Sequence, residues 1–248
     1  MKAIYILWLR QLKRFTRSKS RIIGSAVQPL MFLFALGFGF GPVFQKAGQG
    51  NYIQFLASGI IAMSVLFTSV FSGMEIIWDR QFGFLKETLV APVSRFDIMV
   101  GRTLGGATVA VVQGLIVLCV SFIAGFRPVS LMGVIIGIVI MMLTAILLTA
   151  AGTALGSKLE DPHGFQMIMN FLIQPLFFLS GALFPLAGLP KALSTVTAIN
   201  PLTYAVDGMR GAFTGVSHFG LPMDIGVLIV MNILFLALGA YLFSKIEI

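Results

Sequence analysis

The sequence predicts an all-α polytopic membrane protein with six transmembrane helices. Hydrophobic residues make up 58% of the 248 positions, charged residues only 10%, and the mean hydropathy is +0.98. Soluble domains have about 25% charged residues. Apolar runs of about 20 residues, the length that a spanning helix requires, recur six times, at 22–44, 52–74, 98–126, 129–156, 164–186 and 224–244. We therefore expect a single transmembrane domain that covers residues 1–248.

Residues 1–21 precede the first apolar run and are basic. Residues 2–21 contain seven Lys or Arg and no acidic residue. This composition predicts an amphipathic interfacial helix on the positive side of the membrane, in contact with membrane lipids. A cleaved signal peptide is the alternative, and the following apolar run is longer than a signal peptide requires. The apolar face would carry Ile4, Trp8, Leu12 and Phe15, and the basic face Arg10, Arg14, Arg17 and Arg21.

Basic residues are distributed unevenly between the two sides of this topology. With the amino terminus in the cytoplasm, thirteen Lys and Arg lie inside and four lie outside, namely Lys46, Arg127, Lys191 and Arg210. Because positive charge favours cytoplasmic loops, we expect a multi-pass protein of the cell membrane with both termini in the cytoplasm. The net charge is +8, and the placement of the basic residues fits this membrane topology. Nucleic acid is not an expected partner, because the basic residues are not interleaved with aromatic residues that could stack on bases.

The cytoplasmic stretch 75–97 connects the second and third spans and carries much of the charge. Projected at 100° per residue, it predicts one amphipathic surface helix. Gly83 lies on the polar side, where it costs the helix about 1 kcal/mol relative to alanine, so we expect a partner to approach closely there. The alternative is a plain connector at the lipid headgroups. The apolar side has Ile77, Trp78, Phe82, Leu85 and Leu89; the polar side has Asp79, Arg80, Gly83, Lys86 and Glu87.

Proline and capping residues mark several helix ends. Pro92 disfavours a helical conformation at Ala91. Ser94 followed by Asp97 is a capping-box pattern for the third span, and Asp161 before a proline is the same kind of start for the fifth. The predicted external stretch 187–223 is too apolar for a solvated loop, so we expect short re-entrant helices there.

Within this external stretch, two short helical runs are expected. Asn200 and Pro201 would cap and begin the second run. Asp207 and Arg210 are three residues apart, so they can pair on its polar face. We interpret such a pair as a modest surface ion pair rather than a substrate site.

Polar and aromatic residues inside the spans are candidates for a substrate path. Gln28 precedes Pro29 in span one and Gln174 precedes Pro175 in span five, and each proline would kink its helix. Polar residues in spans line a path or form interhelical hydrogen bonds. Phenylalanine in spans faces lipid or lines an apolar cavity. The candidates are Gln28, Phe32, Asn170, Gln174, Phe177 and Phe178.

Several kinds of chemistry are absent from the sequence. There is no Gly-x-x-x-x-Gly-Lys-Ser/Thr loop to bind nucleotide phosphates. His163 and His218 fall on opposite sides of the predicted membrane, and Cys119 is the only cysteine, so neither a metal site nor a catalytic triad is expected. A chain of intramembrane acids, as in proton-coupled carriers, is also missing. The chain is therefore not expected to be an enzyme, and a pump of this kind would take its energy from another subunit.

The charged stretch carries a resemblance to a known family. Glu75 followed by Arg80, Gly83, Glu87, Pro92 and Gly101-Arg102 resembles the signature of the membrane subunits of type-2 ABC exporters, the drug-resistance and lipo-oligosaccharide permease family. The similarity extends over nearly the whole chain. It includes Ser180-Gly181, Phe184-Pro185, Leu189-Pro190 and Asn200-Pro201-Leu-Thr-Tyr204.

The resemblance implies a permease that pairs with a second copy of itself and with two copies of a cytoplasmic ABC ATPase. ATP and Mg would bind to the ATPase, and no cofactor is expected in this chain. The helix in 75–97 would be the coupling helix. The resemblance assigns ATPase docking to Arg80, Gln81, Gly83, Phe84, Lys86 and Glu87, and structural roles to Glu75, Pro92, Asn200 and Pro201.

The sequence thus predicts the permease subunit of an ATP-driven exporter for an amphiphilic drug, lipid or glycan-linked lipid. An ion-gradient-driven secondary carrier and a non-transporting membrane scaffold are the alternatives. The missing acid relay disfavours the carrier, and the coupling signature disfavours the scaffold.

Overall fold

Among the residues that the computed structural model describes, five long helices are apolar enough to cross a membrane. The structure describes residues 2–48 and 50–245, and these residues contain helices and turns but no strand. The boundaries of the five helices match five of the predicted spans closely, because apolar run length determines them. They are α2 (Lys19–Lys46), α3 (Tyr52–Phe71), which α4 (Met74–Gln81) extends, α6 (Arg95–Ile123), α7 (Leu131–Lys158) and α12 (Leu221–Ser244).

The remaining predicted span, residues 164–186, is helical only as far as Phe178 and contains a π-helical turn. It consists of α8 (Pro162–Ile168), the π-helical turn η1 (Met169–Ile173) and α9 (Gln174–Phe178), with 7, 5 and 5 residues. The backbone then leaves the helical conformation, with Gly181 at φ +71°. A helix that crosses a bilayer needs about 20 residues. The prediction of six spans is therefore not confirmed.

Two helices occupy the stretch for which short helices are predicted, α10 (Lys191–Ile199) and α11 (Pro201–Thr214). Asn200 Oδ1 accepts a hydrogen bond from the Leu202 N–H at 3.0 Å, so the predicted cap of α11 is confirmed. Asn200 Nδ2 also donates to the Leu176 carbonyl oxygen at 2.7 Å. One side chain thus fastens α11 to α9. The position of α10 and α11 relative to a membrane stays a prediction.

Other predicted helix boundaries are confirmed by their hydrogen bonds. Ser94 Oγ accepts from the Asp97 N–H at 3.0 Å, and Asp161 Oδ2 accepts from the Gly164 N–H at 2.9 Å. Ala91, which precedes Pro92, has an extended backbone at φ −61° and ψ 147°. These boundaries depend on neighbouring residues alone, so local chemistry is sufficient to predict them.

The helix formed by α3 and α4 lies at the centre of the bundle. In its most apolar stretch 72% of the residues are buried, compared with 22% and 17% of the residues in the corresponding stretches of α2 and α12. α3 packs against α2, α6, α7 and α11. The exposed surfaces of α2 and α12 carry large apolar residues, as expected of helices that face lipid.

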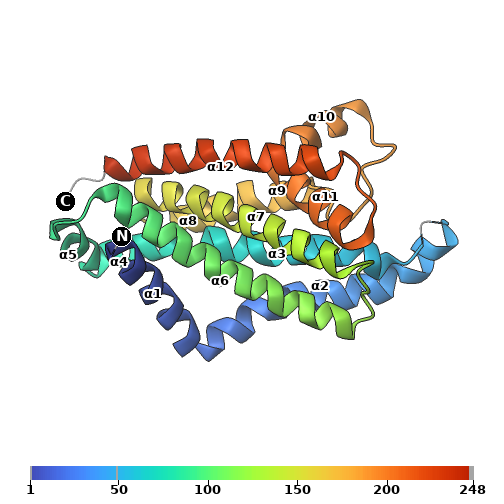
Figure 1. The fold of residues 1–248 in the computed structure, drawn as a ribbon, viewed down its shortest axis with the longest axis horizontal. Coiled ribbons are helices and arrows are strands. Elements are labelled where there is room, and N and C mark those ends of the chain that lie inside the picture. Colours follow the sequence, from blue (N-terminus) through green and yellow to red (C-terminus); the bar gives the residue numbers. More distant parts are fainter. Residues whose placement is uncertain (1, 49, 246–248) are drawn as a thin grey trace.

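The first helix, α1 (Lys2–Arg17), packs along α6. Trp8 Nε1 donates to Thr108 Oγ1 at 3.0 Å, and Phe15 is buried. The predicted apolar face of α1 therefore contacts protein. Figure 1 shows that α1 begins and α12 ends at one end of the bundle, beside α5 (Phe84–Val90), whereas α10 and α11 lie at the opposite end. We call these the α5 end and the α11 end.

Candidate functional site

The segment between α3 and α6 forms a corner at the α5 end. α4 ends at Gln81, Gly83 has φ +81°, and α5 begins at Phe84. Non-glycine residues rarely adopt this left-handed conformation. A Cβ atom at Gly83 would meet no heavy atom within 4 Å. The predicted continuous amphipathic helix is therefore wrong, and within this chain the backbone conformation, not a close contact, requires glycine.

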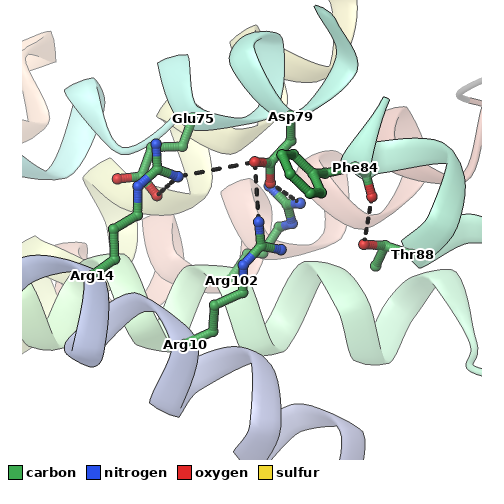
Figure 2. Close-up of polar contacts among 7 residues, drawn as sticks. All are labelled: Arg10, Arg14, Glu75, Asp79, Phe84, Thr88 and Arg102. Atoms are coloured by element: carbon green, nitrogen blue, oxygen red, sulfur yellow. Dashed lines mark hydrogen bonds and ion pairs between the residues drawn. The ribbon is translucent and has the colours of Figure 1, made fainter. Parts of the chain in front are cut away.

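Asp79 points into the bundle, whereas the helical projection places it on the outer polar side. Its carboxylate accepts hydrogen bonds from Arg102 Nη2 at 2.5 Å and from Arg10 Nη2 at 3.2 Å, as Figure 2 shows. Arg102 is only 4% exposed. A buried charge is costly unless an opposite charge and hydrogen bonds compensate it. Asp79 on α4 supplies this compensation and connects α6 with α1.

Glu75 lies one helical turn before Asp79 and is also buried. Arg14 Nη1 lies 3.7 Å from Glu75 Oε2 and 3.9 Å from Asp79 Oδ1. Figure 2 shows Arg14 and Arg10 reaching from α1 toward these two carboxylates. The structural role predicted for Glu75 is consistent with this position. We call Arg10, Arg14, Glu75, Asp79 and Arg102 the ionic cluster.

Arg80, a predicted docking residue, is held by this chain's own α7. Arg80 Nη2 donates to the Ser157 carbonyl oxygen at 2.9 Å, and Nη1 donates to the Leu159 carbonyl oxygen at 3.2 Å. Carbonyl groups in the last turn of a helix lack intrahelical partners and attract cations. Arg80 therefore caps α7, and a docking role for this side chain would compete with that contact.

The other predicted docking residues lie together at the corner. Gln81, Lys86 and Glu87 are exposed and Gly83 is half-buried. Large apolar side chains surround them: Phe82 is 73% exposed, Phe84 51% and Val90 75%. Exposed apolar groups gathered around charged residues mark interaction surfaces. We call residues 81–90 the α5 corner.

Residues 2–214 match the ABC-2 type transporter family. The chain belongs to this family. It is 28% identical to the putative transport permease ycf38 of Cyanophora paradoxa, over 99% of this chain and 89% of the relative. It is 25% identical to the inner membrane transport permease YadH of Escherichia coli K12, over 94% and 91%, and 26% identical to nodulation protein J of Rhizobium leguminosarum, over 84% and 81%.

The family membership confirms the resemblance to type-2 ABC membrane subunits that the sequence motifs indicate. An ABC-2 transporter chain is a multi-pass membrane protein with a transport permease role, and the family implies pairing with an ABC ATPase. The relatives from Cyanophora paradoxa and Escherichia coli are named as transport permeases, which are typically not enzymes.

The substrate-path candidates of this ABC-2 chain lie on different helices. Gln28 on α2 lines a groove of about 340 Å³ whose other lining residues come from α1, α2, α3 and α4, and none comes from η1 or α9. Asn170 and Gln174 are exposed, and Phe178 is 45% exposed. Phe32 is partly buried and Phe177 fully buried against the core. The single chain thus does not bring the candidates together, and their role stays a prediction.

At the α11 end, Asp207 and Arg210 do not form the predicted surface ion pair. Both are buried. The Asp207 carboxylate accepts hydrogen bonds from the backbone N–H groups of His218 and Phe219 at 2.8 to 2.9 Å. Arg210 Nη2 donates to the Gly181 carbonyl oxygen at 2.9 Å, and the guanidinium lies 3.8 Å from the centre of the Phe55 ring. Each side chain ties α11 to a different segment.

The charge of Arg210 persists in this buried position. Burial lowers its pKa to about 10, and the Asp207 carboxylate opposes this shift. The guanidinium therefore stays protonated at neutral pH. It lines a cavity of about 430 Å³ at the α11 end, together with Asp207, Phe55 and His218.

The ionic cluster as a unit was not predicted from the sequence. Glu75 and Gly101-Arg102 were expected only as parts of a family signature, and Arg10 and Arg14 as members of the basic face of an interfacial helix. A charge pattern on one helix does not reveal its partners on other helices. The sequence indicates this cluster only through the position of Asp79 four residues after Glu75, which places both carboxylates on one face of a helix.

Proposed function

We propose that this chain is the permease subunit of an ATP-driven exporter that moves an amphiphilic drug, lipid or glycan-linked lipid out across the cell membrane. Two copies would pair with two copies of an ABC ATPase, which binds ATP and Mg. The α5 end would face the cytoplasm with both termini. The family membership supports the transport role and the pairing with an ATPase.

The observation that carries this proposal is the exposed apolar surface of the α5 corner. Phe82, Phe84 and Val90 lie beside Lys86 and Glu87 at the end of the bundle. An apolar core with a charged rim is the composition of a protein interface. The corner therefore fits a soluble partner such as an ATPase.

The ionic cluster explains how such a partner could move the spans. α5 is joined through α4 to the central helix α3 and through residues 91–94 to α6. Asp79 ties α4 to α1 and to α6 by hydrogen bonds. A force on the α5 corner would thus act on α1, α3, α4 and α6 together. In this way, closure of the ATPases could shift the equilibrium between two arrangements of the bundle.

A double substitution tests the docking surface. We expect Phe84→Asp with Lys86→Glu to lower copurification of the partner ATPase by about tenfold or more, because it removes an apolar anchor and reverses a charge. Both positions are exposed, so the melting temperature of the permease in detergent should not change. Val216→Asp, an exposed position at the α11 end, is the control. Equal ATPase recovery with the double variant and the wild type would contradict this docking surface.

Substitutions of Gly83 distinguish a requirement for its backbone conformation from a requirement for close approach of the ATPase. We expect Gly83→Val to reduce ATPase copurification and ATP-dependent transport severely, because a β-branched residue at φ +81° is strained by about 1–2 kcal/mol or more. Gly83→Asn should retain most of both activities, since asparagine tolerates this conformation. Equal loss in both variants would instead show that an ATPase approaches Gly83 too closely for any side chain.

One observation favours the ion-gradient carrier as a second candidate. Asp224 at the start of α12 is fully buried, and its carboxylate oxygens have no hydrogen-bond partner among the described residues. A buried carboxylate of this kind can bind and release a proton. A carrier would transport cargo in liposomes that contain this chain without any ATPase, and Asp224→Asn would abolish that transport. ATP-dependent transport that Asp224→Asn leaves intact would exclude this candidate. A scaffold would show neither activity.

A further inference from the structure

The corner where α1 meets α2 forms a basic cavity separate from the α5 corner. Figure 1 shows α1 running away from the α5 end and meeting α2 at a sharp bend outside α6. A cavity of about 1040 Å³ lies at this bend. Within the described part of the chain, its polar lining consists of basic residues and serines, with no acidic residue: Arg10, Lys13, Arg14, Arg17, Ser18, Lys19 and Ser20.

Three of these cations have no opposite charge to balance them among the residues that the structure describes. Arg10 and Arg14 pair with carboxylates of the ionic cluster. Lys13, Arg17 and Lys19 are exposed and form no ion pair within residues 2–48 and 50–245. Like charges held together repel one another, so an anion in the cavity would be stabilised by all of them.

Apolar side chains next to the cavity indicate which anion fits. Ile6 and Leu9 line it beside the basic groups. Ile23, Val27 and Met31 continue from the bend along α2 as exposed residues. A phosphate group in the cavity would therefore have an apolar surface beside it for acyl chains. A free inorganic anion would gain nothing from this surface.

We propose that the cavity between α1 and α2 binds the phosphate headgroup of an anionic phospholipid from the surrounding bilayer, with its acyl chains along α2. Lys13, Arg17 and Lys19 supply the charge, and Ile23, Val27 and Met31 contact the chains. Because Arg10 and Arg14 line the same cavity and also hold Glu75 and Asp79, a bound lipid stabilises α1 against α4. This site is independent of the cargo and of the ATPase.

Lipid binding to the purified chain in detergent tests the proposal. Phosphatidylglycerol, phosphatidylcholine and inorganic phosphate serve as probes, and native mass spectrometry counts the bound molecules. We expect phosphatidylglycerol to bind about tenfold or more tightly than phosphatidylcholine, and the triple variant Lys13→Gln, Arg17→Gln, Lys19→Gln to lose that preference, since each basic group near a lipid surface changes affinity by about fivefold. The control Lys46→Gln, Lys158→Gln, Lys191→Gln removes the same charge at exposed positions elsewhere and should keep the preference.

Each other outcome would contradict the proposal that this cavity binds an anionic phospholipid. Unchanged phosphatidylglycerol binding by the triple variant would exclude this cavity, and equal loss in the control variant would show that only total charge matters. Displacement of the lipid by an equal concentration of inorganic phosphate would show that the site recognises the anion without the chains. If the triple variant does not fold, Lys13→Gln alone, at an exposed position, should lower affinity for phosphatidylglycerol by about fivefold, and no loss would exclude the cavity.

Discussion

Asp79→Asn is expected to destabilise the protein by about 3–5 kcal/mol, because it removes the carboxylate that is hydrogen-bonded to the buried Arg102 guanidinium. Arg102 is 4% exposed and donates to the Asp79 carboxylate at 2.5 Å. The neutral amide keeps the shape of the side chain but cannot offset the desolvated guanidinium. Reversible unfolding in mixed micelles, followed by helical content, would measure the loss. A melting temperature in detergent would show the same direction.

Glu160→Gln provides the matched control for this substitution. Its carboxylate lies 3.9 Å from Arg80 Nη1, but the Glu160 side chain is 87% exposed, and exposed ion pairs contribute at most about 1 kcal/mol. If Asp79→Asn lowers the free energy of unfolding no more than Glu160→Gln does, burial does not make the ion pairs of the ionic cluster stronger than an exposed ion pair. The double variant Asp79→Asn with Arg102→Met removes both buried charges, so it should recover at least about 1 kcal/mol relative to Asp79→Asn alone.

The long helices could be predicted because their cause is local. An apolar run of sufficient length favours a helix in a membrane because every backbone polar group must be paired within the segment. The starts of α6, α8 and α11 could be predicted for the same reason, since Ser94, Asp161 and Asn200 cap their own helices. The run at 164–186 has a suitable composition, but its backbone turns at Gly181. Hydropathy carries no information on backbone conformation.

The candidate site could be predicted only in outline. Its position between α3 and α6 follows from charge, and the family signature identified several of its residues. The projection of Asp79 outward assumed one helix through Gly83, because glycine inside a helix costs only about 1 kcal/mol. The partners of Asp79 and Arg210 lie on other helices or distant turns. A sequence without its fold cannot supply those contacts.

Gly73→Val is expected to cause the second large loss, because it would force apart two backbones that touch. Gly73 joins α3 to α4, and a Cβ there would overlap the Gly152 carbonyl oxygen on α7. A Cβ on Gly156 would likewise overlap the Gly73 carbonyl oxygen, and one on Gly152 would lie 2.7 Å from the Val70 carbonyl oxygen. Backbone atoms cannot move aside by changing rotamer. Overpacking in a core costs about 1–3 kcal/mol, and more where backbone must shift.

Gly226→Ala is the control for this effect, since a Cβ at that position in α12 would meet nothing within 4 Å. This substitution should be neutral or stabilise α12 by up to about 1 kcal/mol. Melting temperatures of both variants in detergent would make the comparison. Displacement of α4 by Gly73→Val would also rotate the α5 corner, so ATPase copurification should fall with stability. A Gly73→Val protein as stable as Gly226→Ala would show that α3 and α7 can separate at no cost, and the tight contact between them would then not hold the corner in place.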